Sequence, residues 1–153
     1  MKKTIVTLLL LLLLMIIWSC TKDDFCTQSP VTPNLILRFY DDINRGDLKS
    51  TSGLYVWAEN KDTIFINQAT DSLVIPLNTA SNQTIYNLSE GNVVNQFTIN
   101  YTIRNEFVSR SCGFKSIYEN VTFSSSSTWI TDFTPTTLTS IENQNSAHVQ
   151  IFH

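Results

Sequence analysis

The side chains that could perform hydrolysis are few and lie far apart along the chain. His148 and His153 are the only histidines, and Ser109 and Ser111 have no surrounding G-x-S-x-G motif. Hydrolysis needs a nucleophile beside a base, or a pair of carboxylates in a cleft. We therefore expect no catalytic residues, and we expect His148 to be a surface or sheet-edge residue.

Adjacent aspartates are the main candidates for a metal site. Asp41 and Asp42 follow an apolar segment and precede the turn-forming residues 44–47. Calcium needs six to eight oxygen ligands, and the chain has no D-x-D-x-D-G loop. We expect a turn at Asp41, with no bound metal and no cofactor. The alternative is a hydrolase whose site is assembled from scattered polar residues, with Asp41 and His148 in one cleft.

The first 19 residues have the pattern of a signal peptide. Lys2 and Lys3 precede 15 uncharged residues, 4–18, which include seven consecutive leucines. As a helix this segment would span about 22 Å, less than the ~30 Å hydrocarbon core of a bilayer. Residues 17–20, I-W-S-C, resemble the lipobox of bacterial lipoproteins. We expect removal of residues 1–19 and lipidation of Cys20; a plain signal peptide and a signal anchor are the alternatives.

Short motifs add expectations about location and modification. Lys22, Asp23 and Asp24 resemble the surface-export signal of Bacteroidetes lipoproteins, although any solvated tether could carry such charges. We expect a lipid anchor in the outer membrane, on its periplasmic face or at the cell surface. The tripeptides D-T-I at 62–64 and D-S-L at 71–73 resemble the Bacteroidetes O-glycosylation pattern, with Thr63 and Ser72 as acceptors.

One of the three cysteines is a candidate for lipidation, and the other two are a candidate pair. If Cys20 is lipidated, Cys26 and Cys112 remain as an even pair in an oxidising compartment. A disulfide between them would close a loop of about 87 residues, which stabilises by roughly 4–5 kcal/mol through loop-closure entropy. The alternatives are a redox pair or metal ligands, but no C-x-x-C motif or histidine cluster accompanies them.

Composition sets the size and the charge of the mature protein. The whole chain has 153 residues and a net charge of −3. Loss of Lys2 and Lys3 leaves eight basic and 13 acidic residues in positions 20–153, and 8 − 13 gives −5. This length fits a tether at 20–30 followed by one domain at 31–153. The acidic balance, without a basic cluster, argues against a nucleic-acid partner.

Alternation of apolar and polar residues favours strands. The clearest segment is F-T-I-N-Y-T-I-R at 97–104, with its apolar residues at odd positions. Leu35, Leu37 and Phe39 likewise share one face of a strand at 35–40. Further strands are expected at 54–59, 63–67, 73–77, 84–88, 114–123, 128–133, 137–142 and 148–152.

Turn-forming residues separate these segments. They occur at 44–47, 60–62, 78–82, 89–92 and 143–146, and the serines at 124–127 predict a loop. About nine or ten short strands joined by tight turns predict an all-β fold, an antiparallel β-sandwich of immunoglobulin-like or transthyretin-like type.

Three aromatic residues are candidates for an exposed binding patch. In the strand at 54–59, Tyr55 and Trp57 share one face, and Leu54 and Val56 share the other. If the aliphatic face is core, the aromatic face could bind a glycan or a protein together with Trp129. Core packing is the commoner fate of tryptophan and is the alternative.

Several segments resemble a family of small Bacteroidetes lipoproteins classed as domain of unknown function 6452. The most distinctive is V-S-R-S-C-G-F-K at 108–115, and the others are at 22–26, 32–41, 71–78, 101–102 and 147–152. The resemblance implies that Cys26 and Cys112 belong to the family pattern as a pair. It implies no activity.

Together these features predict a lipoprotein of the cell envelope without catalysis. We expect a binding or envelope-assembly module that contacts the membrane through its lipid and takes an envelope protein or a glycan as partner. A purely structural envelope component and an anchored hydrolase are the alternatives.

Overall fold

The computed structural model describes Cys26 and residues 32–59 and 61–153. The predicted signal peptide (1–19) and the rest of the predicted tether (20–30), with Cys20, Lys22, Asp23 and Asp24, lie outside the described residues. In the part that is described, no helix is long and apolar enough to cross a membrane.

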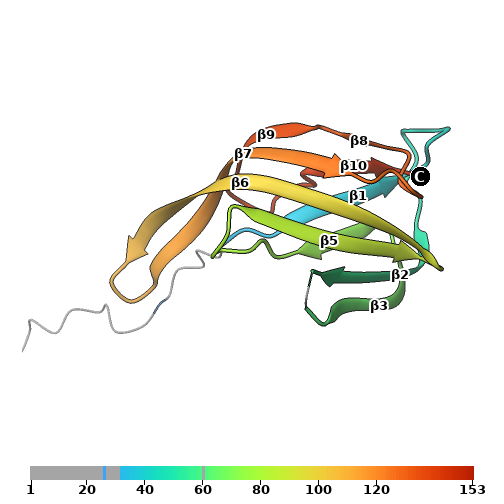
Figure 1. Ribbon diagram of the computed structural model, residues 1–153. Coiled ribbons are helices and arrows are strands. Elements are labelled where there is room, and N and C mark those ends of the chain that lie inside the picture. The colour runs from blue at the N-terminus through green and yellow to red at the C-terminus, as the bar shows by residue number, and fades with distance from the viewer. Residues whose placement is uncertain (1–25, 27–31, 60) are drawn as a thin grey trace, which may run out of the picture. The chain divides into compact units, whose positions relative to one another are not determined.

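Ten strands of the described residues form two sheets (Figure 1). Their bounds are β1 Leu35–Tyr40, β2 Thr51–Ala58, β3 Thr63–Thr70, β4 Ser72–Ile75, β5 Gln83–Glu90, β6 Val93–Ser109, β7 Gly113–Ser125, β8 Asp132–Thr134, β9 Thr137–Ile141 and β10 Val149–Phe152. One sheet has the order β4-β1-β10-β8, and the other has the order β3-β2-β5-β6-β7-β9. The all-β sandwich predicted from the sequence is confirmed.

Residue contacts divide the chain into two compact units. Residues 31–106 and 115–153 form the sandwich, and residues 107–114 group with the N-terminal residues 1–30. The predicted single domain at 31–153 therefore contains a short segment, at the turn between β6 and β7, that belongs to the other unit.

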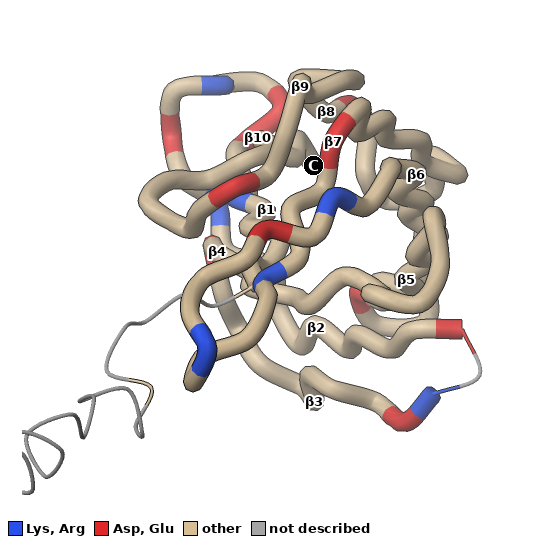
Figure 2. Tube along the Cα trace, turned by 90° about the vertical axis from the view of Figure 1, so that its left-hand side faces the viewer, with Lys and Arg blue, Asp and Glu red and all other residues tan. Residues whose placement is uncertain are grey.

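The alternation of apolar residues places the core between the sheets. Leu35, Leu37 and Phe39 of β1 have no exposed surface, and neither have Phe97 and Ile99 of β6. Because successive side chains of a strand point to opposite faces, alternate residues of β1 and of the first half of β6 reach this core. Lys and Arg residues and Asp and Glu residues are interspersed along the described chain (Figure 2).

The pairing of β1 with β10 is parallel, which departs from the expected antiparallel arrangement. Leu37 lies opposite Val149, and Phe39 lies opposite Ile151. Parallel neighbours need a long connection, and here the other strands of both sheets provide it. No local turn pattern specifies such a pair, so the sequence did not indicate its direction.

The strand expected at 128–133 is mostly wrong, because β8 begins only at Asp132. Buried Asn95 explains the difference: its side-chain oxygen accepts hydrogen bonds from both the backbone N–H and the hydroxyl of Thr128 (2.9 and 3.1 Å). The indole N–H of Trp129 donates to the carbonyl of Leu88 (2.9 Å). These side-chain contacts hold the segment before β8 in a conformation other than a strand.

The β7 strand is longer than expected. It continues through Ser125, into the serine run that predicts a loop at 124–127. The hydroxyl of Ser125 hydrogen-bonds with the side chain of Asn95 (2.9 Å to Nδ2), which ties the end of β7 to β6. Serine has weak strand propensity, and this tertiary contact overrides it.

Candidate binding groove

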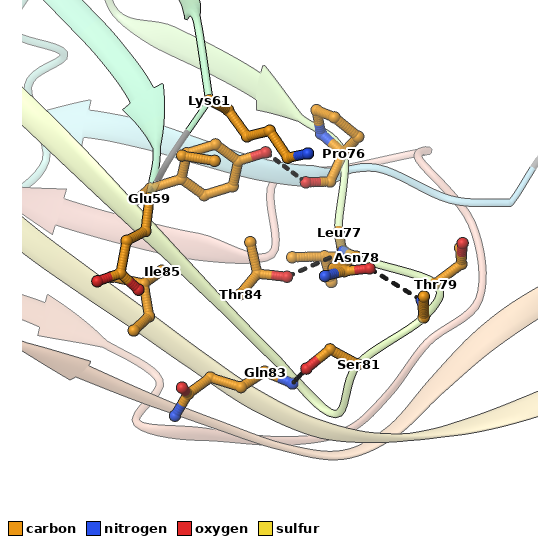
Figure 3. A pocket seen from close by; sticks show the side chains of 13 residues that line it. Glu59, Lys61, Pro76, Leu77, Asn78, Thr79, Ser81, Gln83, Thr84 and Ile85 are labelled. Atoms are coloured by element: carbon orange, nitrogen blue, oxygen red, sulfur yellow. Dashed lines mark hydrogen bonds between the residues drawn. The ribbon is translucent and has the colours of Figure 1, made fainter.

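An open groove of about 720 Å³ lies where the end of β2 meets the loop between β4 and β5 (Figure 3). Its lining comprises Ala58, Glu59, Lys61, Pro76, Leu77, Asn78, Thr79, Ala80, Ser81, Gln83, Thr84, Ile85 and Tyr86. The volume is in the range of protein pockets that hold small ligands. Figure 3 shows that Glu59 and Lys61 border it from the β2 side, and Thr79 and Ser81 border it from the loop.

The loop wall of the groove is held by three buried tyrosines from three strands. The phenol O–H of Tyr86 donates to the carbonyl of Pro76 (2.6 Å), and that of Tyr118 donates to the carbonyl of Leu77 (3.1 Å). The phenol O–H of Tyr101 donates to the next carbonyl, that of Asn78 (2.8 Å). Three consecutive carbonyls are therefore fixed from the core, and the backbone of the wall is preorganised.

Thr84 extends this network into the groove. Its hydroxyl oxygen accepts the backbone N–H of Asn78 (2.9 Å) and lies 2.6 Å from the phenol oxygen of Tyr101. Because the Tyr101 hydrogen is already donated to Asn78, the Thr84 hydroxyl donates to Tyr101. The backbone N–H of Tyr101 also donates to the carbonyl of Asn82 (2.9 Å).

Burial keeps these phenols in the form that donates. It raises the pKa of Tyr86 and that of Tyr118 to about 12, with a smaller contribution from the neighbouring Tyr101. It also raises the pKa of Tyr101, against the hydrogen bond that Tyr101 accepts from Thr84. All three hydrogen bonds are therefore present across the neutral pH range.

The surface of the groove offers mainly neutral hydrogen-bonding groups. Asn78, Thr79, Ser81 and Gln83 supply amides and hydroxyls, and Glu59 and Lys61 supply one charge of each sign. Some of these groups also support the loop: Asn78 Oδ1 accepts from Ala80, and Ser81 Oγ accepts from Gln83. Such a lining suits a polar ligand without net charge.

His148 links backbone groups within the fold and does not line the groove. Its Nδ1 accepts the backbone N–H of Ile36 (3.0 Å), so its Nε2 carries the proton and donates to the carbonyl of Asn143 (2.9 Å). Burial lowers its pKa, against the raising effect of the Asn143 bond. His148 is half-buried beside the central strand β1, so the expectation of a sheet-edge position is wrong.

Asp41 caps a turn, as predicted. Its Oδ1 accepts the backbone N–H groups of Asn44 (2.7 Å) and Ile43 (2.9 Å). The Asn44 bond is the main cause that lowers the pKa of this carboxyl, and Lys49, 3.4 Å away, adds to it. Neither Asp41 nor His148 lines the groove. In the described part of the chain, no group of three or more His, Cys, Asp or Glu side chains could hold a metal ion.

The serines near Cys112 form a turn. Ser109 Oγ accepts the backbone N–H of Cys112 (3.0 Å) and lies 3.3 Å from Ser111 Oγ. Cys112 is joined to Cys26 by a disulfide, with the two Cα atoms 4.9 Å apart. The pair expected from the cysteine count is therefore bridged in the structure.

The three aromatic candidates do not form one exposed patch. Leu54 and Val56 are buried, and Tyr55 on the opposite face of β2 is 37% exposed, as the alternation predicts. Trp57 is half-buried. Trp129 packs against the core, with its ring centroid 6.1 Å from that of Phe39, so it does not join an exposed patch.

The two candidate O-glycosylation residues begin strands. Thr63 is the first residue of β3 and is exposed, whereas Ser72 is the first residue of β4 and is half-buried. The hydroxyl of Thr63 is the more accessible acceptor of the two.

Sequence reasoning missed the tyrosines that form the groove wall. Tyr86 shares the inward face of β5 with Leu88, and Tyr101 shares that of β6 with Ile99. A tyrosine at a core position needs a partner for its hydroxyl. That requirement was the available signal, but the partner carbonyls at 76–78 are distant in sequence.

Comparison with known proteins gives a family and no function. Neither the curated proteins nor the solved structures gave a significant match. A family model described as a family of unknown function (DUF6452) matches residues 53–153. This range includes Cys112 and the segments at 71–78, 108–115 and 147–152, but not those at 22–26 and 32–41. Because the match covers more than half of the chain, the protein belongs to the DUF6452 family.

Proposed function

We propose that this protein is a non-catalytic binding module, anchored to the outer membrane by a lipid on Cys20, whose groove takes an uncharged segment of a glycan. The observation that carries the proposal is the groove wall, in which Tyr86, Tyr118 and Tyr101 fix three consecutive carbonyls. A preorganised wall lowers the entropy that a ligand must overcome on binding.

The chemistry of the lining favours a glycan. Sugar hydroxyls both donate and accept hydrogen bonds, and the amides of Asn78 and Gln83 and the hydroxyls of Thr79 and Ser81 can match both roles. The charges of Glu59 and Lys61 offset each other, so the groove has no preference for an anion or a cation. A protein segment of the envelope is the other partner class, and the same experiment separates the two.

A hydrolytic role is less well supported by this arrangement. It requires Asp41 and His148 in one cleft, yet each is hydrogen-bonded to local backbone outside the groove. The location rests on the sequence: the leader at 1–19, the lipobox-like I-W-S-C and the tether at 20–30 support anchoring, on the periplasmic face or at the surface.

Saturation-transfer difference NMR on the mature protein tests the groove. The probes are neutral trisaccharides of glucose, mannose, xylose and N-acetylglucosamine, with a short uncharged peptide as the comparison. We expect transfer to at least one sugar, and loss of that transfer in Gln83→Ala. The matched control is Gln150→Ala, an exposed amide on β10 outside the groove, which should bind normally.

Two outcomes contradict the proposal. Transfer to the peptide alone assigns the groove to a protein partner. If no sugar receives saturation transfer, the glycan assignment is wrong. It is also wrong if the Gln83 and Gln150 variants transfer saturation to the sugar equally. The anchor is tested separately: Cys20→Ala should release the protein from membranes or leave an uncleaved precursor, and unchanged membrane fractionation contradicts lipidation.

A further inference from the structure

Two phenylalanine rings, one from β6 and one from β7, are exposed beside the turn that joins these strands. We call residues 107–114 the hairpin tip. Phe107 is 58% exposed and Phe114 is 68% exposed, and their ring centroids are 5.4 Å apart at an angle of 66°. The rings therefore form an aromatic pair that remains largely in contact with solvent. Neither ring has a polar atom that water could hydrate favourably.

The hairpin tip is weakly basic in an acidic protein. Its sequence, F-V-S-R-S-C-G-F, contains one charged residue, Arg110. The charges that flank the tip neutralise each other, because Lys115 Nζ lies 3.1 Å from Glu106 Oε1. Exposed aromatic rings beside one arginine, without a carboxylate, match the residue types that are enriched at membrane interfaces.

The disulfide gives the hairpin tip a short covalent path to the predicted anchor. Six residue steps separate Cys20 from Cys26, which is at most about 22 Å of chain. The Cys26 and Cys112 Cα atoms add 4.9 Å. Cys112 therefore stays within about 27 Å of the lipidated residue in every conformation, a distance comparable to the ~30 Å hydrocarbon core of a bilayer.

We propose that the hairpin tip is a second membrane contact, in which Phe107 and Phe114 insert into the headgroup region of the bilayer that holds the lipid. The proposal rests on the anchoring at Cys20 and gives the disulfide a role in it. Without the bridge, the path from Cys20 to Thr32, where the described chain resumes, is twelve residue steps. The bridge joins Cys20 to the hairpin tip through six residue steps and one disulfide.

A bilayer accounts for these features better than a protein partner does. The short path keeps the hairpin tip near the membrane at all times, so insertion has a high effective concentration without any encounter step. Arg110 adds attraction to anionic headgroups.

Photo-crosslinking in the full-length lipoprotein tests the contact. A benzoyl-phenylalanine replaces Phe107, Phe114 or, as the matched control, Tyr55, an exposed aromatic residue on β2. Each protein is reconstituted in vesicles of phosphatidylethanolamine and phosphatidylglycerol, irradiated and analysed by mass spectrometry. We expect at least about tenfold more lipid adduct at 107 and 114 than at 55, which corresponds to about 1.4 kcal/mol of preference.

The same mass spectra show whether the anchoring at Cys20 or the membrane contact of the hairpin tip is wrong. The mass of the N-terminal peptide reports whether Cys20 carries lipid; an unmodified Cys20 overturns the anchoring and the path argument with it. A lipidated Cys20 with equal adduct yields at 107, 114 and 55 overturns the membrane contact alone. Crosslinks from 107 and 114 to a second protein in cell envelopes, without lipid adducts, assign the hairpin tip to a protein partner instead.

Discussion

At the residue scale, Tyr101 is the tyrosine of the groove wall whose hydroxyl makes two hydrogen bonds. It is 3% exposed, donates to the carbonyl of Asn78 and accepts from Thr84. We expect Tyr101→Phe to lower the free energy of unfolding by about 1–3 kcal/mol, because both partners lose a hydrogen bond in a buried site. Urea denaturation measures the change. The control Tyr55→Phe removes an exposed hydroxyl; an equal effect in both variants contradicts the role of the network.

His148 makes stability depend on pH above the range in which carboxylates titrate. Burial lowers its pKa in the folded protein from the ordinary value of 6.5. As the pH falls through 6.5, the unfolded chain takes up a proton that the folded protein resists, so the free energy of unfolding decreases until the lowered pKa is reached. Above pH 6.5 this contribution is complete.

The variant His148→Asn isolates this effect. Its side-chain oxygen can accept the N–H of Ile36 but does not titrate. We expect urea unfolding between pH 7 and pH 5 to show a decline in stability for the native protein and a flatter profile for the variant. Parallel profiles would show that His148 does not cause the pH dependence in this range.

At the element scale, β3 is an unusual sheet edge. It has eight residues without a charge, and Ile64 and Ile66 are 49% and 60% exposed. Among the described strands, the edges β4 and β8 have only four and three residues, and each is followed closely by a proline. An uncharged edge strand exposes unpaired backbone groups and promotes edge-to-edge association.

We therefore expect Ile66→Lys to reduce self-association of the protein at high concentration, measured by light scattering. Its free energy of unfolding should change by no more than about 0.5 kcal/mol, because the side chain is exposed. The matched control is Ile43→Lys, which adds the same charge at a residue that is 90% exposed in a loop. If both variants reduce association equally, net charge and not the β3 edge is responsible.

The sequence predicts an element well when nearby residues determine it, and poorly when contacts between distant residues determine it. The inward residues of β1 and β6 follow from alternation alone, because a strand with one face in the core has a period of two. The direction of β10 beside β1, and the interruption before β8, depend on partners such as Val149 and Asn95 that are far away in the chain. The groove was not predictable for the same reason, since Tyr118 and Leu77 meet only after both sheets have formed.

At the scale of the whole molecule, the disulfide links positions 86 residues apart. Loop-closure entropy predicts that Cys112→Ser lowers the free energy of unfolding by up to about 4–5 kcal/mol. Chemical denaturation gives the value, and Cys26→Ser should match it because either change opens the same loop. Alkylation of the native protein followed by intact mass analysis provides the check: two labelled thiols without reductant would show that the bridge is not formed.

The place of β10 also constrains the order in which the protein can be completed. β10 is the last strand in chain order, yet it lies between β1 and β8 in its sheet. If the protein is exported from its N-terminus, as we propose, β1 must wait for residues 149–152 with one of its edges unpaired. The interval between the arrival of β1 and that of β10 is then the period in which periplasmic chaperones or proteases can act on this chain.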